Sequence, residues 1–321
     1  SAEKPLEFRY QSENHFSEAS IMVVKESAVQ SGENQLNVFT MGNNETKPII
    51  LVHGLRDSAK SLFALGVELA KNYLVLIPDL RGHGASPHFN SYQMPDFLGD
   101  LHEIIATLTK GSCALFGHSL GGHIASRYSA LFPETIRCLM LVEGLGPPTK
   151  KDDNEGDYVR YYRNSLESRL INARKGSRPL KDLDHAIGRL MLNNPRLNKE
   201  RAKELAASLT VQSNGLLYWN FDPKANGVFI GASQLENEKF WRQVECPTCI
   251  VSGALSHEYW SRELTSGERS GYFQQGEMEE RVSVFQNAEH IWFENSGHMV
   301  HYDEPERLAN LCIEFLEEKY D

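Results

Sequence analysis

Short runs of consecutive apolar residues recur along the chain and are separated by polar, turn-forming segments. A continuous apolar run of this kind is typical of a strand that is buried on both faces of a parallel sheet. These runs, with two strand-like segments that flank a turn-rich stretch near the N-terminus, predict eight strands. They are residues 19–24, 35–41, 48–52, 73–78, a strand that begins at 113, 137–142, 248–252 and 289–293.

Amphipathic segments lie between the apolar runs and predict helices. After Pro95, apolar residues recur at the spacing of one helical face: Phe97, Leu101, Ile104, Ile105 and Leu108. Residues 308–316 near the C-terminus show the same pattern. Strands that alternate with amphipathic helices predict an α/β fold, in which helices cover both faces of a parallel sheet.

The alternation is interrupted after Gly144. Residues 145–245 have polar and helical patterns and contain no run typical of a buried strand. We therefore predict a first part of the core at residues 1–144, a helical cap inserted at 145–245, and a second part of the core at 246–321. The cap contains aromatic residues that either contact an apolar substrate or pack the cap onto the sheet. These are Tyr158, Tyr161, Tyr162, Tyr218, Trp219 and Phe221.

Composition narrows the possible partners. The chain has 321 residues and a formal net charge of −10, and no basic run is present. This balance argues against nucleic acid, whose phosphates are bound by clustered Lys and Arg. No apolar run approaches the roughly 20 residues of a membrane span, and the first residues lack the order of a signal peptide. A cytoplasmic protein without a membrane span is expected.

The cysteines indicate a reducing compartment. There are five, an odd number at low density, which is not typical of a disulfide scaffold. Cys246 and Cys249 form a C-x-x-C pattern, but the pair leads into a predicted strand. A redox pair needs its first cysteine at a helix N-terminus, and no second ligand pair for zinc follows. A structural role is therefore predicted for both thiols.

The segment around Ser119 has the pattern of a nucleophile elbow. Gly117-His118-Ser119-Leu120-Gly121 lies where a predicted strand turns into a predicted helix. Small residues at the first and last positions allow the strand and helix to approach, and the central serine projects from a strained turn. A serine at the start of a helix can instead act as a cap. The flanking pattern favours a nucleophile.

Four segments together resemble the α/β-hydrolase superfamily over essentially the whole chain. They are His53-Gly54 after the third strand, residues 79–86, the elbow, and residues 296–305. Their order and separation match the family pattern. The resemblance implies an eight-stranded, mostly parallel sheet with helices on both faces and a helical cap inserted after strand six.

The resemblance also implies candidate catalytic roles. Ser119 is the expected nucleophile, and His298, in a loop after the last strand, is the expected base. His301 is the nearest rival, but it leads directly into the last helix. The backbone N–H groups of Leu55 and Leu120 are expected to form the oxyanion hole.

The sequence leaves open which residue is the acid of the site. Many family members carry an aspartate after strand seven, but residues 252–259 of this chain contain none. Glu143 follows the buried run of strand six, where a carboxylate is costly without a partner. It is the favoured acid, although it could instead pair with Arg137 or cap the first turn of the cap. Glu258 is the alternative acid, and a site without a working acid is the third reading.

These roles predict a serine hydrolase that cleaves a carboxylic ester through an acyl-enzyme intermediate, with a Ser-His-Glu triad. Amides, thioesters and carbon–carbon bonds can be cleaved by the same chemistry. The expected partner is a small-molecule acyl substrate with an apolar moiety, and no metal or organic cofactor is required. The alternatives are a non-catalytic or weakly catalytic ligand-binding protein on the same fold, and a cofactor-free perhydrolase of the haloperoxidase type.

Overall fold

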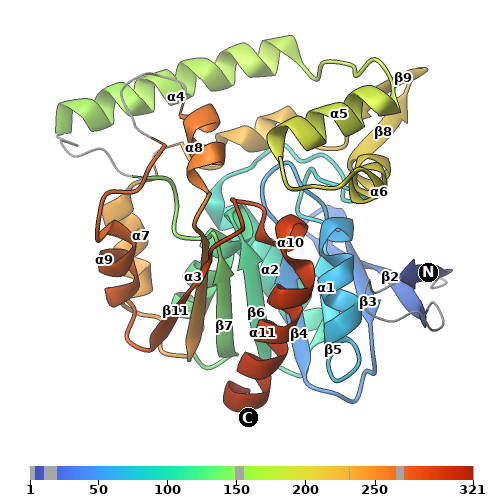
Figure 1. Cartoon of the computed structure of the whole chain (residues 1–321), viewed down its shortest axis with the longest axis vertical. Helices are drawn as coiled ribbons and strands as arrows, with labels where there is room; N and C mark the ends of the chain where they lie inside the picture. Colours follow the sequence, from blue (N-terminus) through green and yellow to red (C-terminus); the bar gives the residue numbers. More distant parts are fainter. Residues whose placement is uncertain (1–3, 11–19, 149–154, 231, 265–270, 321) are drawn as a thin grey trace.

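A nine-stranded sheet forms the centre of the chain in this computed structural model (Figure 1), which describes residues 4–10, 20–148, 155–230, 232–264 and 271–320. The order of the strands is β1-β2-β3-β5-β4-β6-β7-β10-β11. The bounds are β1 Lys4–Tyr10, β2 Ser20–Ser31, β3 Asn34–Met41, β4 Pro48–Val52, β5 Leu74–Pro78, β6 Cys113–His118, β7 Ile136–Val142, β10 Thr248–Gly253 and β11 Ala288–Phe293.

The predicted fold is confirmed. The eight strands from β2 to β11 in this sheet correspond to the eight predicted segments, and the neighbours from β5 to β11 pair in parallel. The other pairs are antiparallel: β1 with β2, β2 with β3, and β3 with β5. β1 is an added edge strand that the pattern did not predict. β2 also continues to Ser31, beyond the predicted end, because it pairs with β3 along that whole length.

Helices cover both faces of the sheet, and each face has its own apolar core. α1 (Phe63–Leu69) and α11 (Pro305–Lys319) lie over one face, while α2 (Met94–Leu108) and α3 (Leu120–Leu131) lie over the other. Ile50 and Leu51 are neighbours in β4 but belong to opposite cores. Since successive strand residues point to opposite faces, this double burial explains the continuous apolar runs.

The segment between β7 and β10 contains mostly helices. They are α4 (Glu155–Lys175), α5 (Leu183–Asn193), α6 (Lys199–Leu209), η2 (Pro223–Gly227) and α7 (Gln234–Trp241). Figure 1 shows α4, α5 and α6 above one end of the sheet. It is the end at which β10 finishes and the chain continues towards α8 (His257–Glu263). α7 instead packs against α3 beside the sheet. The division of the chain at residues 145 and 245 stays a prediction.

A short hairpin in this segment was not predicted. β8 (Thr210–Ser213) and β9 (Leu216–Trp219) pair antiparallel around Asn214 and Gly215, which both have positive φ. Asn-Gly is the preferred pair for such a two-residue turn. The hairpin packs beside an apolar cluster shared by α5 and α6. None of the helices in the described ranges is both long and apolar enough to cross a membrane.

The cysteines lie in the interior of the fold, which supports the structural role predicted for Cys246 and Cys249. All five are buried, and none of them is in a disulfide. Burial raises the pKa of the Cys246 and Cys249 thiols to about 12. Because the thiolate is the reactive form, these raised pKa values argue against a redox role for the C-x-x-C pair.

The start of α3 lies unusually close to the end of β7. A Cβ added to Gly122 would be 2.7 Å from the Cα of Gly144, a contact between two backbones. We expect Gly122→Ala to lower the free energy of unfolding by about 1–3 kcal/mol, because the added methyl group forces the two closely packed backbones apart. Urea denaturation measures this change. Gly99→Ala in α2 is the control, because a Cβ there meets no atom within 4 Å. It should stabilise the helix by about 0.5–1 kcal/mol. A Gly122→Ala variant as stable as the wild type would contradict the close approach.

Candidate active site

The structure brings together three of the predicted residues at the carboxyl edge of the sheet. His298 Nε2 lies 3.1 Å from Ser119 Oγ, and His298 Nδ1 lies 2.9 Å from Glu143 Oε2. Ser119 follows β6, Glu143 follows β7, and His298 lies between β11 and α10 (Val300–Asp303). Since a carboxylate oxygen can only accept, Nδ1 carries the proton and Nε2 is free to accept the serine hydroxyl.

Ser119 has the backbone of a nucleophile elbow. Its φ and ψ are 53° and −116°, a region that costs on the order of 1–3 kcal/mol for a residue with a Cβ. A Cβ on Gly117 would collide with the carbonyl oxygen of Gly121, and one on Gly121 with that of Val52. The serine side chain makes no capping hydrogen bond to α3. Its hydroxyl therefore faces His298 rather than the helix.

Glu143 is buried, and both of its carboxylate oxygens have donors. Oε1 accepts the backbone N–H of Gly253 at 2.7 Å, and Oε2 accepts His298 Nδ1–H. Only 4% of the side chain is exposed. A carboxylate this deep needs such partners to offset its lost hydration. The partners are Gly253 and His298 rather than Arg137.

Glu258, the alternative acid, is not brought to His298. Its two oxygens bind the guanidinium of Arg196, at 2.8 and 3.2 Å. This hydrogen-bonded pair lowers the pKa of Glu258 despite the opposing effect of partial burial. Arg196 also binds Asp303 at 2.9 Å, and Asp303 accepts the N–H of Gly297 at 2.8 Å. Glu258 therefore links the segment between α5 and α6 to the core.

The loop that carries Leu55 lies against the elbow. A Cβ on Gly54 would be 3.2 Å from the Cβ of Ser119. Leu120 is the first residue of α3, so its N–H has no partner within the helix. His53 holds this loop, since it donates to the Gly54 carbonyl and accepts the N–H of Leu80. The two predicted oxyanion donors thus belong to segments that meet at Ser119.

His83 holds the same loop from the other side. It donates from Nδ1 to the carbonyl of Arg81 and accepts the N–H of Arg56 at Nε2, 3.1 Å away. Arg56 has a positive φ of 64°, so this hydrogen bond helps to fix a strained residue directly after Leu55. Burial lowers the pKa of His83 to about 3, and repulsion from His53 adds to that effect. His83 is therefore neutral at pH 7.

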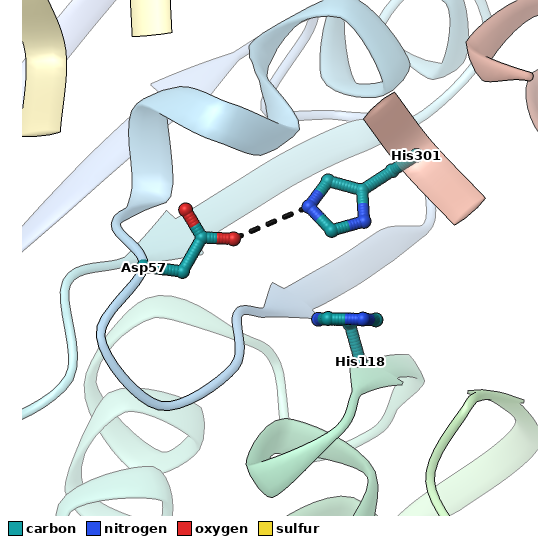
Figure 2. Close-up of side chains that lie close together, drawn as sticks. All are labelled: Asp57, His118 and His301. Carbon is teal, nitrogen blue, oxygen red and sulfur yellow. Dashed lines mark hydrogen bonds and ion pairs between the residues drawn. The ribbon is translucent and has the colours of Figure 1, made fainter. Parts of the chain in front are cut away.

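A second polar cluster includes Asp57, two residues after Leu55, and sequence reasoning missed it. Figure 2 shows Asp57, His118 and His301 together, with a hydrogen bond of 3.2 Å between His301 Nε2 and Asp57. The ring of His118 packs against that of His301 and donates from Nε2 to the carbonyl oxygen of His298 at 2.8 Å. His118 therefore points away from the serine and fixes the backbone of the histidine that faces Ser119.

The three side chains of this cluster can each offer a ligand atom to a cation, with all three atoms within 4.8 Å of one another. The hydrogen bonds argue for a scaffold instead. Asp57 already accepts four donors: Ser58 N–H, Ser61 O–H, Tyr302 O–H and His301 N–H. Burial opposes its ionisation, but the hydrogen bond and charge of His301 outweigh this effect and lower the pKa of Asp57. A cation would have to displace these donors.

The aromatic residues of the predicted cap differ in their burial and in the groups that they contact. Trp219 packs against the apolar cluster of α5 and α6, and Phe221 stacks on His83 with ring centroids 6.1 Å apart. Tyr218 is half-buried and Tyr162 is 43% exposed. The side chains of Tyr158 and Tyr161 lie outside the described residues. Packing thus accounts for Trp219 and Phe221, and the ring on which Phe221 stacks is that of His83, which binds Arg56.

A mostly parallel sheet whose carboxyl edge carries a hydroxyl, an imidazole and a carboxylate in hydrogen-bonded order is the architecture of an α/β-hydrolase. The chain belongs to the alpha/beta hydrolase fold family, which matches residues 47–305. This match covers most of the chain and confirms the predicted class of enzyme.

Several known proteins are similar to the chain. Human serine hydrolase-like protein 2 is 24% identical over 286 residues, which cover 86% of this chain and 88% of that protein. The sn-1-specific diacylglycerol lipase ABHD11 of Danio rerio is 22% identical over 285 residues, 86% of this chain and 80% of the lipase. The thioesterase domain from the curacin biosynthetic pathway superposes with a TM-score of 0.73 at 22% identity, over 90% of this chain and 99% of that domain. This structural likeness concerns the fold.

The neutral state of His83 predicts a pH dependence of stability. Its pKa is about 3 in the folded protein and about 6.5 when unfolded, so between these values the unfolded chain binds more protons. Stability therefore falls as the pH drops from 6.5 towards 3. From pH 7 to pH 5, His83 should account for a loss of about 1–2 kcal/mol.

The variant His83→Gln keeps an acceptor for Arg56 but does not titrate. Urea denaturation at pH 7 and pH 5 should show that His83→Gln loses about 1–2 kcal/mol less stability between these pH values than the wild type does. His185→Gln, at an exposed histidine on α5, is the matched control. An equal loss in His83→Gln and the wild type would show that His83 is not buried in the neutral form.

Proposed function

We propose that the chain hydrolyses carboxylic esters through an acyl-enzyme formed on Ser119. The observation that carries this proposal is the unbroken hydrogen-bond series Ser119 Oγ, His298 and Glu143, at 3.1 and 2.9 Å. A serine hydroxyl is a weak nucleophile at neutral pH and needs an adjacent base. The tautomer that the carboxylate imposes on His298 presents that base to the serine.

The reaction proceeds in two halves. In the first, Ser119 Oγ forms a bond with the substrate carbonyl carbon while His298 Nε2 takes its proton. The backbone N–H groups of Leu55 and Leu120 bind the oxygen that becomes negative. The intermediate then collapses, and His298 gives the proton to the departing alcohol. In the second half, water attacks the acyl carbon with His298 as base, and Ser119 recovers its proton.

Glu143 acts as the acid of the triad in this proposal. Its oxygens already bind Gly253 and His298, so it can hold the imidazole in one orientation and stabilise the imidazolium that forms. The absence of an aspartate after β10 therefore does not require a site without an acid. The contact between Glu143 and His298 thus favours an enzyme over a non-catalytic ligand-binding protein.

The names of the relatives favour acyl chemistry. A diacylglycerol lipase and a thioesterase domain both act on an acyl group bonded to oxygen or sulfur. We extend only this shared class to the chain and propose a small-molecule acyl ester, with an apolar moiety, as substrate. A panel of p-nitrophenyl esters with increasing acyl length tests the proposal, and the absence of turnover across the panel would count against it.

The nucleophile and the base can be tested with a fluorophosphonate probe, which bonds to an activated serine. The wild type should be labelled, while Ser119→Ala and His298→Ala should not. Ester turnover should fall by about 10⁴-fold or more in each, because the groups act as a unit. Ser208→Ala, at a half-buried serine of α6, should label like the wild type. Labelling of folded Ser119→Ala, or none of the wild type, would overturn the proposal.

The acid can be tested by a matched pair of substitutions. Glu143→Gln should lower kcat by about 10²- to 10⁴-fold, because an amide cannot stabilise the imidazolium or select its tautomer. Glu258→Gln should keep kcat within about tenfold, since Glu258 binds Arg196 instead. If only Glu258→Gln loses activity, the acid has been assigned to the wrong residue.

A further inference from the structure

One face of the His298 imidazole is covered by an aromatic ring that has no role in the reaction described above. Tyr259 stacks on His298 with ring centroids 4.0 Å apart and the planes 14° from parallel. Trp260 contacts the same imidazole edge-on, at 5.1 Å and 67°. Both rings belong to α8, the helix that follows β10.

Among the described residues that hydrogen-bond to the His298 imidazole, Glu143 carries the only negative charge. Glu143 lies at Nδ1, Ser119 at Nε2, and His118 binds the backbone carbonyl of His298. Burial lowers the pKa of His118, and repulsion from His301 and His298 lowers it further, so His118 is neutral. The face of a phenol ring carries negative electrostatic potential and attracts a cation stacked on it.

We propose that Tyr259 is a positioning residue for the reaction: its ring keeps the imidazole of His298 in plane between Ser119 and Glu143 and stabilises the imidazolium that forms when Ser119 loses its proton. This inference rests on the proposed function. Two in-plane hydrogen bonds fix the rotation of the imidazole, and the stacked ring limits its tilt.

The ring acts as a neutral phenol. Burial and the nearby charge of Glu263 raise the pKa of Tyr259, so its hydroxyl keeps its proton. Tyr259 therefore adds no negative charge that would compete with Glu143. The contribution that remains is that of the ring face, which a phenylalanine would keep and an aliphatic side chain would lose.

α8 is held on two sides, which fixes the position of Tyr259. On the side of the cap, Glu258 binds Arg196 at 2.8 Å and Arg262 donates to the carbonyl of Asn193 at 2.6 Å. On the side of the loop that carries Leu55, Glu263 binds Arg56 at 3.3 Å. Residues on either side of Tyr259 in this short helix thus contact the cap segment and the loop that carries Leu55.

The test compares Tyr259→Leu with Tyr259→Phe. The measurement is the second-order rate of fluorophosphonate labelling from pH 5 to pH 9, whose rise with pH reports the titration of His298. In Tyr259→Leu the plateau rate should fall by about 2- to 30-fold and the midpoint should move to lower pH by about 0.5–1 unit, because the imidazolium loses its stacked ring. Tyr259→Phe should match the wild type in both. Ester kinetics should place the loss in kcat rather than in KM.

A shape-matched series keeps the test independent of folding. Phenylalanine analogues with one, three and five ring fluorines, placed at position 259, weaken the ring potential with little change in volume. The midpoint should fall progressively along the series, whereas a purely structural ring would leave it unchanged. An unchanged midpoint across the series, or an equal loss in Tyr259→Phe and Tyr259→Leu, overturns the inference. Failure of the wild type to be labelled would instead overturn the proposed function.

Discussion

The hydrogen bond between Glu143 and His298 is the interaction on which the arrangement of the site depends. It joins residues 155 positions apart, and both side chains are almost fully buried, at 4% and 2% exposure. A carboxylate removed from water is stable only with donors on its oxygens. Glu143 finds them in the N–H of Gly253 and in His298, so the ends of β7 and β10 and the loop after β11 must meet at one point.

The register of the sheet produces this meeting. His118 pairs with Val142 at the ends of β6 and β7, so Ser119 and Glu143 are the next residues on neighbouring strands. Both have positive φ, at 53° and 51°. Each such residue costs on the order of 1–3 kcal/mol and persists where its surroundings fix it. Here the N–H of Ser119 binds the carbonyl of Val142, and that of Glu143 binds the carbonyl of Val251.

Sequence reasoning predicted most of the sheet, because strands buried on both faces leave continuous apolar runs. β1 was missed because residues 4–10 contain no continuous apolar run. The β8–β9 hairpin was missed although Asn214-Gly215 is a turn pattern. In the site, Ser119, His298 and Glu143 follow strand ends, and parallel strand ends gather at one edge. Asp57, Arg196 and Tyr259 were missed, because their contacts depend on how the loops and the segment between β7 and β10 pack at that edge.

The choice between Glu143 and Glu258 shows where the pattern is insufficient. Both follow strands that neighbour each other in the sheet, and only the local backbone decides which one faces His298. Glu143 is the first residue after β7 and turns inward, whereas Glu258 lies in α8, which begins after a short loop that follows β10, and it binds Arg196. Since β7 supplies the carboxylate that binds His298, the segment after β10 does not have to supply one. That segment instead places the ring of Tyr259 on the imidazole and binds Arg196 through Glu258. Two strand ends thus provide different contacts of His298: the residue after β7 binds Nδ1, and α8 provides the stacked ring and the connection to Arg196.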